Sequence, residues 1–248
     1  MFDFQSHFIF PTHAVPKAGK LPQGAEGLSL ATSDGETIRG VHIPPHDAPE
    51  RRTVILGFGG NAWNGQDVAE YLHELYPEAD VVTFHYRGYS PSTGSPSAEA
   101  LIADAPLVYD FAKKRMKASR IIAVGFSIGT GVALQLAAAR PVCGLILVTP
   151  FDSLRAVAQA MYPWLPIGPV FAHEIDAGAA VQRVQVPVAV IEAQRDEIVP
   201  AERTNALRRQ IPNLVFDRTI ARAGHNDIYV RSDFHEAMRE ALEAVSGR

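Results

Sequence analysis

Five short apolar runs, rich in β-branched residues, constrain the fold of this chain more than any other feature of its sequence. They lack the alternation of apolar and polar residues that a half-exposed strand shows. Runs that are apolar on both faces are typical of a parallel sheet covered by helices on both sides. The runs span residues 53–56, 80–84, 120–125, 144–148 and 186–192. Segments with helical spacing lie between and after them, over residues 67–76, 98–117, 128–140, 154–161, 201–210 and 229–245. This alternation predicts a doubly wound α/β fold.

Two further runs precede the first parallel one. Residues 28–32 and 37–42 flank Ser33-Asp34-Gly35-Glu36, a hairpin turn signal, and predict antiparallel strands at one edge of the sheet. Residues 214–220 are another candidate strand. A chain of 248 residues can bury a full core as one domain, and neither an interdomain linker nor an internal repeat is visible. We therefore expect a single domain over residues 1–248, with an irregular N-terminal extension over residues 1–27.

Pro106 falls inside the expected helix at residues 98–117. Proline lacks the backbone N–H and its ring collides with the preceding turn, so it predicts a break or a kink there. Asp104 could cap a second helix that has Pro106 in its first turn.

The sharpest local motif is Gly125-Phe126-Ser127-Ile128-Gly129, which stands between an apolar run and a helical segment. Gly-x-Ser-x-Gly in a strand, turn, helix context is the pattern of a nucleophile elbow. A serine hydroxyl needs such a tight turn to stand clear of the sheet and within reach of a base. The glycines leave room for the neighbouring strand and helix. The Ile128 N–H, at the start of the helix, would then point at a developing oxyanion.

A serine nucleophile needs a base, and His225 stands apart from the other eight histidines. It lies in Ala223-Gly224-His225-Asn226-Asp227, a short loop between the last candidate strand and the final helical segment. Such a loop can reach over the ends of the parallel strands. His85, at the end of the strand at residues 80–84, points to the same end of the sheet and is the alternative base.

The acid that orients the base is expected to follow a strand and to precede the histidine. Asp196 does both, which gives the chain order Ser127, Asp196, His225. A carboxylate there would accept the imidazole N–H, fix its tautomer and stabilise the imidazolium. Asp152, which follows the strand at residues 144–148, is a permitted alternative.

The second oxyanion donor is expected in the turn Gly57-Phe58-Gly59-Gly60-Asn61-Ala62, which follows residues 53–56. The N–H of Asn61 is our choice, with that of Ala62 as the alternative. The turn also fits Gly-x-Gly-x-x-Ala, a dinucleotide fingerprint. That kind of site requires an acidic residue at the end of the next strand, whereas the sequence has His85-Tyr86-Arg87 there.

Together these residues resemble the α/β-hydrolase superfamily. The resemblance rests on the motifs around Ser127, Asp196 and His225, on Tyr86-Arg87-Gly88-Tyr89-Ser90 and on Gly94-Ser95-Pro96-Ser97, and it covers residues 28–245. The nearest branch contains single-domain serine hydrolases such as thioesterases, lysophospholipase-like and monoacylglycerol-lipase-like enzymes. The resemblance implies an eight-stranded, mostly parallel sheet, with Ser127 as nucleophile, Asp196 as acid and His225 as base. One position departs from it, because Gly59 stands where that branch usually has a histidine.

The resemblance also implies a short cap. Residues 162–176 form an apolar, aromatic stretch interrupted by prolines, between the sixth and seventh parallel-type strands, where this superfamily inserts its caps. We expect a cap over about residues 151–180. The stretch at residues 162–176 is either a loop packed over the core or a lid that lines an acyl pocket.

The sequence thus predicts a serine hydrolase that cleaves a small ester or thioester with an apolar acyl group through an acyl-enzyme. Two rival functions stay open. A serine peptidase would share the machinery and differ in the pocket, and a non-catalytic binding protein would keep the fold alone.

Composition excludes several other classes. The net charge is −4 and no long basic stretch occurs, which argues against a nucleic-acid partner. The lone Cys143 cannot form an internal disulfide and the first residues do not resemble a signal peptide, so we expect a cytoplasmic protein. No apolar stretch approaches the roughly 20 residues of a membrane span. No Cys or His cluster has metal-ligand spacing, so neither a metal nor a cofactor is expected.

Overall fold

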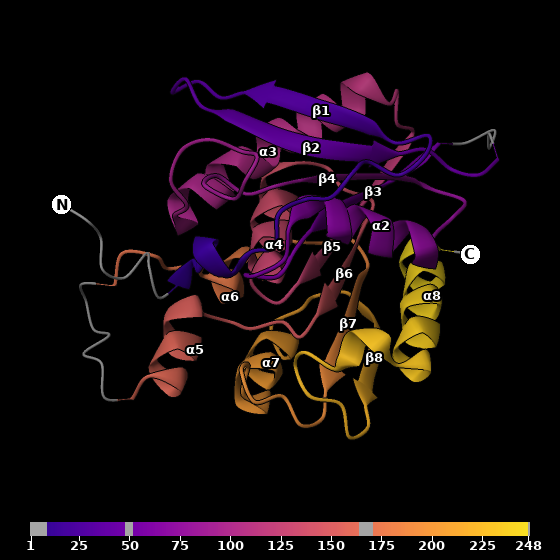
Figure 1. Cartoon of the computed structure of the whole chain (residues 1–248). Coiled ribbons are helices and arrows are strands. Elements are labelled where there is room, and N and C mark those ends of the chain that lie inside the picture. The colour runs from indigo at the N-terminus through magenta and orange to yellow at the C-terminus, as the bar shows by residue number, and fades with distance from the viewer. Residues whose placement is uncertain (1–8, 48–51, 164–170, 248) are drawn as a thin grey trace.

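One mixed sheet organises the structure, a computed structural model that describes residues 9–47, 52–163 and 171–247. In these residues eight strands lie in the order β1-β2-β4-β3-β5-β6-β7-β8 (Figure 1). They are β1 (Glu26–Ala31), β2 (Thr37–Ile43), β3 (Thr53–Phe58), β4 (Asp80–Phe84), β5 (Arg120–Phe126), β6 (Gly144–Val148), β7 (Val188–Ala193) and β8 (Leu214–Ile220). β2 pairs antiparallel with β1 and β4, and the other neighbours are parallel. The predicted α/β class, with its antiparallel edge, is confirmed.

Helices cover both faces of this sheet. They are α2 (Gly65–Leu75), α3 (Ala98–Arg115), α4 (Ile128–Ala139), α5 (Leu154–Met161), α6 (Ala177–Val181), α7 (Ala201–Arg208) and α8 (Ser232–Ser246), with short 3₁₀ turns η1 (Thr12–Ala14) and η2 (Ile228–Val230). Polar side chains start several of them: Asn64, Ser97, Ser153 and Asp176 each accept a hydrogen bond from a backbone N–H of the first turn. Such caps satisfy donors that have no partner inside the helix.

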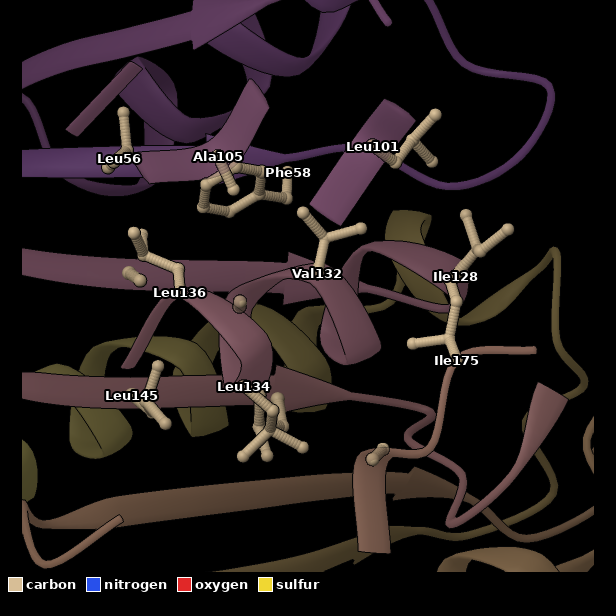
Figure 2. Close-up of a cluster of buried hydrophobic side chains, with 14 of the residues drawn as sticks. Leu56, Phe58, Leu101, Ala105, Ile128, Val132, Leu134, Leu136, Leu145 and Ile175 are labelled. Carbon is tan, nitrogen blue, oxygen red and sulfur yellow. The ribbon is translucent and has the colours of Figure 1, made fainter. Parts of the chain in front are cut away.

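Alternate residues of the central strands enter two separate apolar layers. On β3, Val54 and Leu56 belong to the layer with α3 and α4, whereas Ile55 belongs to the layer with α2 and α8. Figure 2 shows part of the first layer, in which Val132 and Leu136 of α4 lie among side chains of the strands. Burial of both strand faces explains why the runs are continuously apolar in the sequence.

The expected break at Pro106 is wrong, because α3 continues through it from Ala98 to Arg115. Asp104 does not cap a second helix. Its carboxylate instead pairs with Arg87, at 2.9 Å from Nε and 2.6 Å from Nη2. Packing of α3 against the sheet outweighs the loss of one backbone hydrogen bond at a proline.

The connection from β6 to β7 contains α5 and α6, where the cap was expected. An isolated bridge pairs Ser153, which precedes α5, with Asp176, which precedes α6. Residues 164–170 lie outside the described residues, and they are seven of the fifteen residues of the expected loop or lid at residues 162–176. In the described part of the chain, no helix has both the length and the apolar character needed to cross a lipid bilayer.

Candidate active site

Ser127 occupies a strained turn between β5 and α4. Its backbone has φ 50° and ψ −118°, a conformation that side-chain-bearing residues rarely adopt. The turn is fixed on both sides, because the Ser127 N–H donates to the Val148 carbonyl at 2.9 Å and the Thr130 hydroxyl donates to the Ser127 carbonyl at 2.6 Å. The strained turn is thus held by β6 on one side and by α4 on the other.

The glycines that flank Ser127 leave room for adjacent backbone. A Cβ atom on Gly125 would lie 2.5 Å from the Gly129 carbonyl oxygen. A Cβ atom on Gly129 would lie 2.7 Å from the Gly59 carbonyl oxygen and closer still to that of Phe58. Real Cβ atoms do not approach so closely, so the motif needs glycine at both places for steric reasons.

The structure brings Ser127, His225 and Asp196 together from three separate loops. His225 Nε2 lies 3.0 Å from Ser127 Oγ, and its Nδ1 lies 2.8 Å from Asp196 Oδ2. Both side chains of the second contact are buried, with exposures of 6% for His225 and 4% for Asp196. Asp196 Oδ1 also accepts the N–H groups of Ile198 and Val199, at 2.9 and 2.7 Å. These bonds fix the carboxylate, which can then orient the imidazole and stabilise its charged form.

Glu197 holds the histidine loop, a role that sequence reasoning missed. Its Oε2 accepts the backbone N–H of His225 at 3.1 Å, and Asp227 Oδ1 accepts that of Gly224 at 2.7 Å. The contact pairs residues 28 positions apart, so no local pattern indicated it.

The two expected oxyanion donors lie on the same cavity as Ser127 and His225. The Ile128 N–H begins α4, where a backbone donor has no acceptor one turn earlier in the helix. Asn61 lies in the turn after β3, and Gly60 of that turn is so near the elbow that a Cβ atom on it would lie 3.9 Å from the Ser127 Cβ. An oxyanion beside Ser127 requires two N–H donors, and the sequence predicts them at the start of α4 and in the turn after β3.

The cavity has a volume of about 600 Å³ and is mainly apolar. One wall is a stripe on α5 whose members recur at helical spacing: Leu154, Val157, Ala158 and Met161. Ile9 and Pro11, from the start of the described chain, also line it. Among the described residues no Asp, Glu, Lys or Arg does so. The site therefore suits an uncharged, apolar group beside the serine.

Ala62, the alternative oxyanion donor, lines the same cavity, but neither the alternative base nor the alternative acid joins this group. His85 is 3% exposed, and its Nδ1 accepts the Gly65 N–H at 3.1 Å. Asp152 lies 3.4 Å from Arg203 Nη1. In the described part of the chain, neither forms a hydrogen bond with Ser127 or His225. Both side chains are used to join neighbouring elements instead.

Burial lowers the pKa of His85 to about 4, which predicts a pH-dependent contribution to stability. Between pH 6.5 and 4 the unfolded chain binds a proton that folded His85 does not. Stability from this group is therefore complete above pH 6.5 and is lost as the pH falls toward 4, by about 3 kcal/mol. Urea unfolding at pH 7 and pH 4.5 should show a smaller pH difference for His85→Asn, whose amide oxygen can still accept the Gly65 N–H. An equal pH difference in both proteins would contradict the assignment.

Comparisons with known proteins show the family and the fold of the chain. A family model described as alpha/beta hydrolase fold matches residues 54–184. An uncharacterized protein of Mycobacterium tuberculosis is 32% identical over 221 residues, which are 86% of this chain and 76% of that protein. Lysophosphatidylserine lipase ABHD12 of Danio rerio is 32% identical over 170 residues. The match covers 59% of this chain and 44% of that lipase, so this chain spans less than half of the lipase's length.

Solved structures show the same fold. The esterase Pf2001 of Pyrococcus furiosus superimposes with a TM-score of 0.75 at 17% identity, over 94% of this chain and 97% of that one. Est1E of Butyrivibrio proteoclasticus, solved with ferulic acid, superimposes with a TM-score of 0.74 at 16% identity, over 89% of this chain and 100% of that one. At such low identity the likeness concerns the fold.

Proposed function

The chain belongs to the alpha/beta hydrolase fold family, and from this premise we propose that it is a serine hydrolase that cleaves an ester or thioester of an apolar acyl group. The observation that carries the proposal is the continuous chain of contacts from Ser127 Oγ through His225 to the Asp196 carboxylate. The fold of this family alone would not specify a reaction, because function depends on the residues of the site.

In the first half of the proposed reaction, Ser127 Oγ attacks the acyl carbon while His225 Nε2 accepts its proton. The carbonyl oxygen becomes an oxyanion, which the N–H groups of Ile128 and Asn61 bind. The intermediate then collapses, the bond to the leaving group breaks, and His225 returns the proton to the leaving oxygen or sulfur. In the second half, water attacks the acyl-enzyme with the same proton transfers, which frees the acid and the Ser127 hydroxyl.

The cavity supports an acyl substrate over an aminoacyl one. A free amino group carries a positive charge near neutral pH and would need a carboxylate partner when it is buried against apolar side chains. The described lining offers none, whereas the α5 stripe offers apolar surface. The similarity to a lysophosphatidylserine lipase points the same way. A single domain over residues 1–248 with a cap near residues 151–180, and a cytoplasmic location, stay predictions.

Labelling with a fluorophosphonate tests the proposal. The probe forms a covalent bond with an activated serine, so we expect the wild-type protein to be labelled and Ser127→Ala to be unlabelled. Ser119→Ala is the matched control, because Ser119 lies just before β5, away from the cavity, and donates to the Arg52 carbonyl. Fluorescence after gel electrophoresis measures the outcome. A wild-type protein without Ser127-dependent labelling would favour the non-catalytic alternative.

A short substrate panel then separates esterase from peptidase. p-Nitrophenyl esters of increasing acyl length are expected to be hydrolysed faster than aminoacyl anilides. Faster cleavage of the anilides would reverse the assignment.

A further inference from the structure

The motif Tyr86-Arg87-Gly88-Tyr89 forms a tight turn directly after β4 and His85. The Tyr89 N–H donates to the Tyr86 carbonyl at 2.9 Å, and Gly88 has φ 75°. Closure over four residues with a positive φ at the third position is the geometry of a type II turn, which favours glycine there. Arg87 anchors the turn from outside, because its guanidinium pairs with Asp104 of α3 and with Asp34 of the β1–β2 hairpin. The turn therefore fixes the backbone positions of Tyr86 and Tyr89 relative to each other.

Both tyrosine hydroxyls reach the turn that carries Asn61. The Tyr86 hydroxyl donates to the Gly59 carbonyl at 2.9 Å. The Tyr89 hydroxyl contacts the Asn61 backbone oxygen at 2.6 Å and the Asn61 side-chain oxygen at 2.9 Å. On its other side, the Asn61 amide nitrogen donates to the Ile9 carbonyl. The two carbonyls that the tyrosines contact stand immediately before and after the peptide unit that joins Gly60 to Asn61.

That middle peptide unit carries the Asn61 N–H. A peptide unit is rigid, so its direction depends on the soft dihedral angles at its two ends. Gly60 leaves one of these ends unusually free, and neither Gly59 nor Gly60 has a side chain that could brace the turn. Hydrogen bonds that fix the preceding and following carbonyls restrict both ends. The Gly60 carbonyl, in the same unit as the N–H, accepts the Trp63 N–H at 3.3 Å, which turns the Asn61 N–H to the opposite side.

The two tyrosines are buried enough to hold their hydrogen bonds to this turn in place. Tyr89 is 1% exposed, Tyr86 is half-buried, and their rings pack edge to face with centroids 5.8 Å apart. Burial raises the pKa of both phenols well above the usual value near 10, so both keep the proton that they donate throughout the neutral range.

We propose that Tyr86 and Tyr89 are positioning residues, whose hydroxyls hold the turn after β3 in the shape that directs the Asn61 N–H at the oxyanion. The inference rests on the proposed function, since it assigns support to that same oxyanion site. It also accounts for Gly59 at the position where a histidine was expected, because the support comes from a neighbouring turn instead.

Tyr→Phe substitutions test the assignment, because they remove the hydroxyl and keep the ring. Removal of a direct oxyanion donor lowers kcat by about 10²–10³. A donor that is merely less well directed should cost less, so we expect kcat to fall about tenfold for Tyr86→Phe and for Tyr89→Phe and about 10²-fold for the double variant. KM for a p-nitrophenyl ester should stay within about twofold. Affinity for a trifluoromethyl ketone of matched acyl group, which mimics the oxyanion, should fall by the same factor as kcat.

Two tyrosines far from the site provide matched controls. The Tyr76 hydroxyl donates to the Met238 carbonyl at 2.8 Å, and the Tyr109 hydroxyl donates to the Pro141 carbonyl at 2.9 Å. Tyr76→Phe and Tyr109→Phe lose the same kind of bond. Thermal melts of all the variants therefore measure general destabilisation. We expect kcat to fall only in Tyr86→Phe, Tyr89→Phe and their double variant.

The outcomes are distinguishable. If Tyr86→Phe, Tyr89→Phe and the double variant keep wild-type kcat and ketone affinity, the positioning role is overturned even where melting temperatures fall. The positioning role is likewise overturned if the control variants lose as much kcat. If the double variant does not fold, the two single variants decide by the same readouts. Absence of Ser127-dependent turnover in the wild-type protein would instead contradict the proposed function.

Discussion

Ser127→Ala is expected to lower kcat by about 10⁶-fold, and Asp196→Asn by about 10⁴-fold. The difference follows from what each change removes. Alanine at position 127 removes the atom that forms the acyl bond. Asparagine at position 196 keeps the shape of the carboxylate but loses its charge, and its NH₂ group would face either His225 Nδ1 or the N–H groups of Ile198 and Val199. In the first orientation the imidazole loses the correct tautomer, and in the second the NH₂ group faces two backbone donors. In both orientations the imidazole loses the charge that stabilises its protonated form.

The double variant Ser127→Ala/Asp196→Asn should be no slower than Ser127→Ala alone. Residues that act as one unit are not additive, because the base has no task once the nucleophile is gone. Steady-state rates with a p-nitrophenyl ester measure all three proteins, with Ser119→Ala as the control. Multiplicative losses in the double variant would show that Asp196 acts on the reaction independently of Ser127. A Ser127→Ala protein with more than about a hundredth of wild-type activity would require a different nucleophile.

The fold was predictable because its signals are local. Both β-branched runs and helical spacing are patterns over a few neighbouring residues, and β4 and β6 begin and end where the runs at residues 80–84 and 144–148 do. The failures came where tertiary contacts prevail. Pro106 is carried through α3 by packing, and the five residues of α6 are too few to show a helical period. Contacts with residues far away in the sequence determine the structure of these segments, and no local sequence pattern indicates such contacts.

The three residues of the contact chain in the candidate site were also predictable from the sequence. Ser127, Asp196 and His225 each follow a strand, and the carboxyl ends of parallel strands meet at one edge, so chain order sufficed to group them. The residues that support them were not predictable. Glu197 holds the His225 backbone across 28 positions, and the Tyr89 hydroxyl reaches Asn61 across 28 positions. Both contacts depend on how separate loops fold over each other.

Gly129→Ala should lower the free energy of unfolding by about 3 kcal/mol, the upper end of what overpacking costs. The sign is opposite to the intrinsic preference, because Ala in a helix such as α4 is favoured over Gly by about 1 kcal/mol. The new methyl group would lie 2.7 Å from the Gly59 carbonyl oxygen and would also collide with that of Phe58. These are backbone atoms of β3 and of the turn that carries Asn61, so they cannot yield as a flexible side chain would.

Relief of that collision should move the turn away from Ser127, and a displacement of about 1 Å at a reacting centre costs about 10²-fold in rate. Gly60→Ala is the matched control for stability. Its methyl group would meet the Phe126 carbonyl oxygen and the Ser127 Cβ at 3.9 Å, which is ordinary contact, so its unfolding free energy should stay within about 0.5 kcal/mol of wild type. Urea unfolding followed by tryptophan fluorescence compares the two variants. Equal stability of Gly129→Ala and Gly60→Ala would mean that α4 can shift away from β3, and that the glycine after the nucleophile is not required for packing.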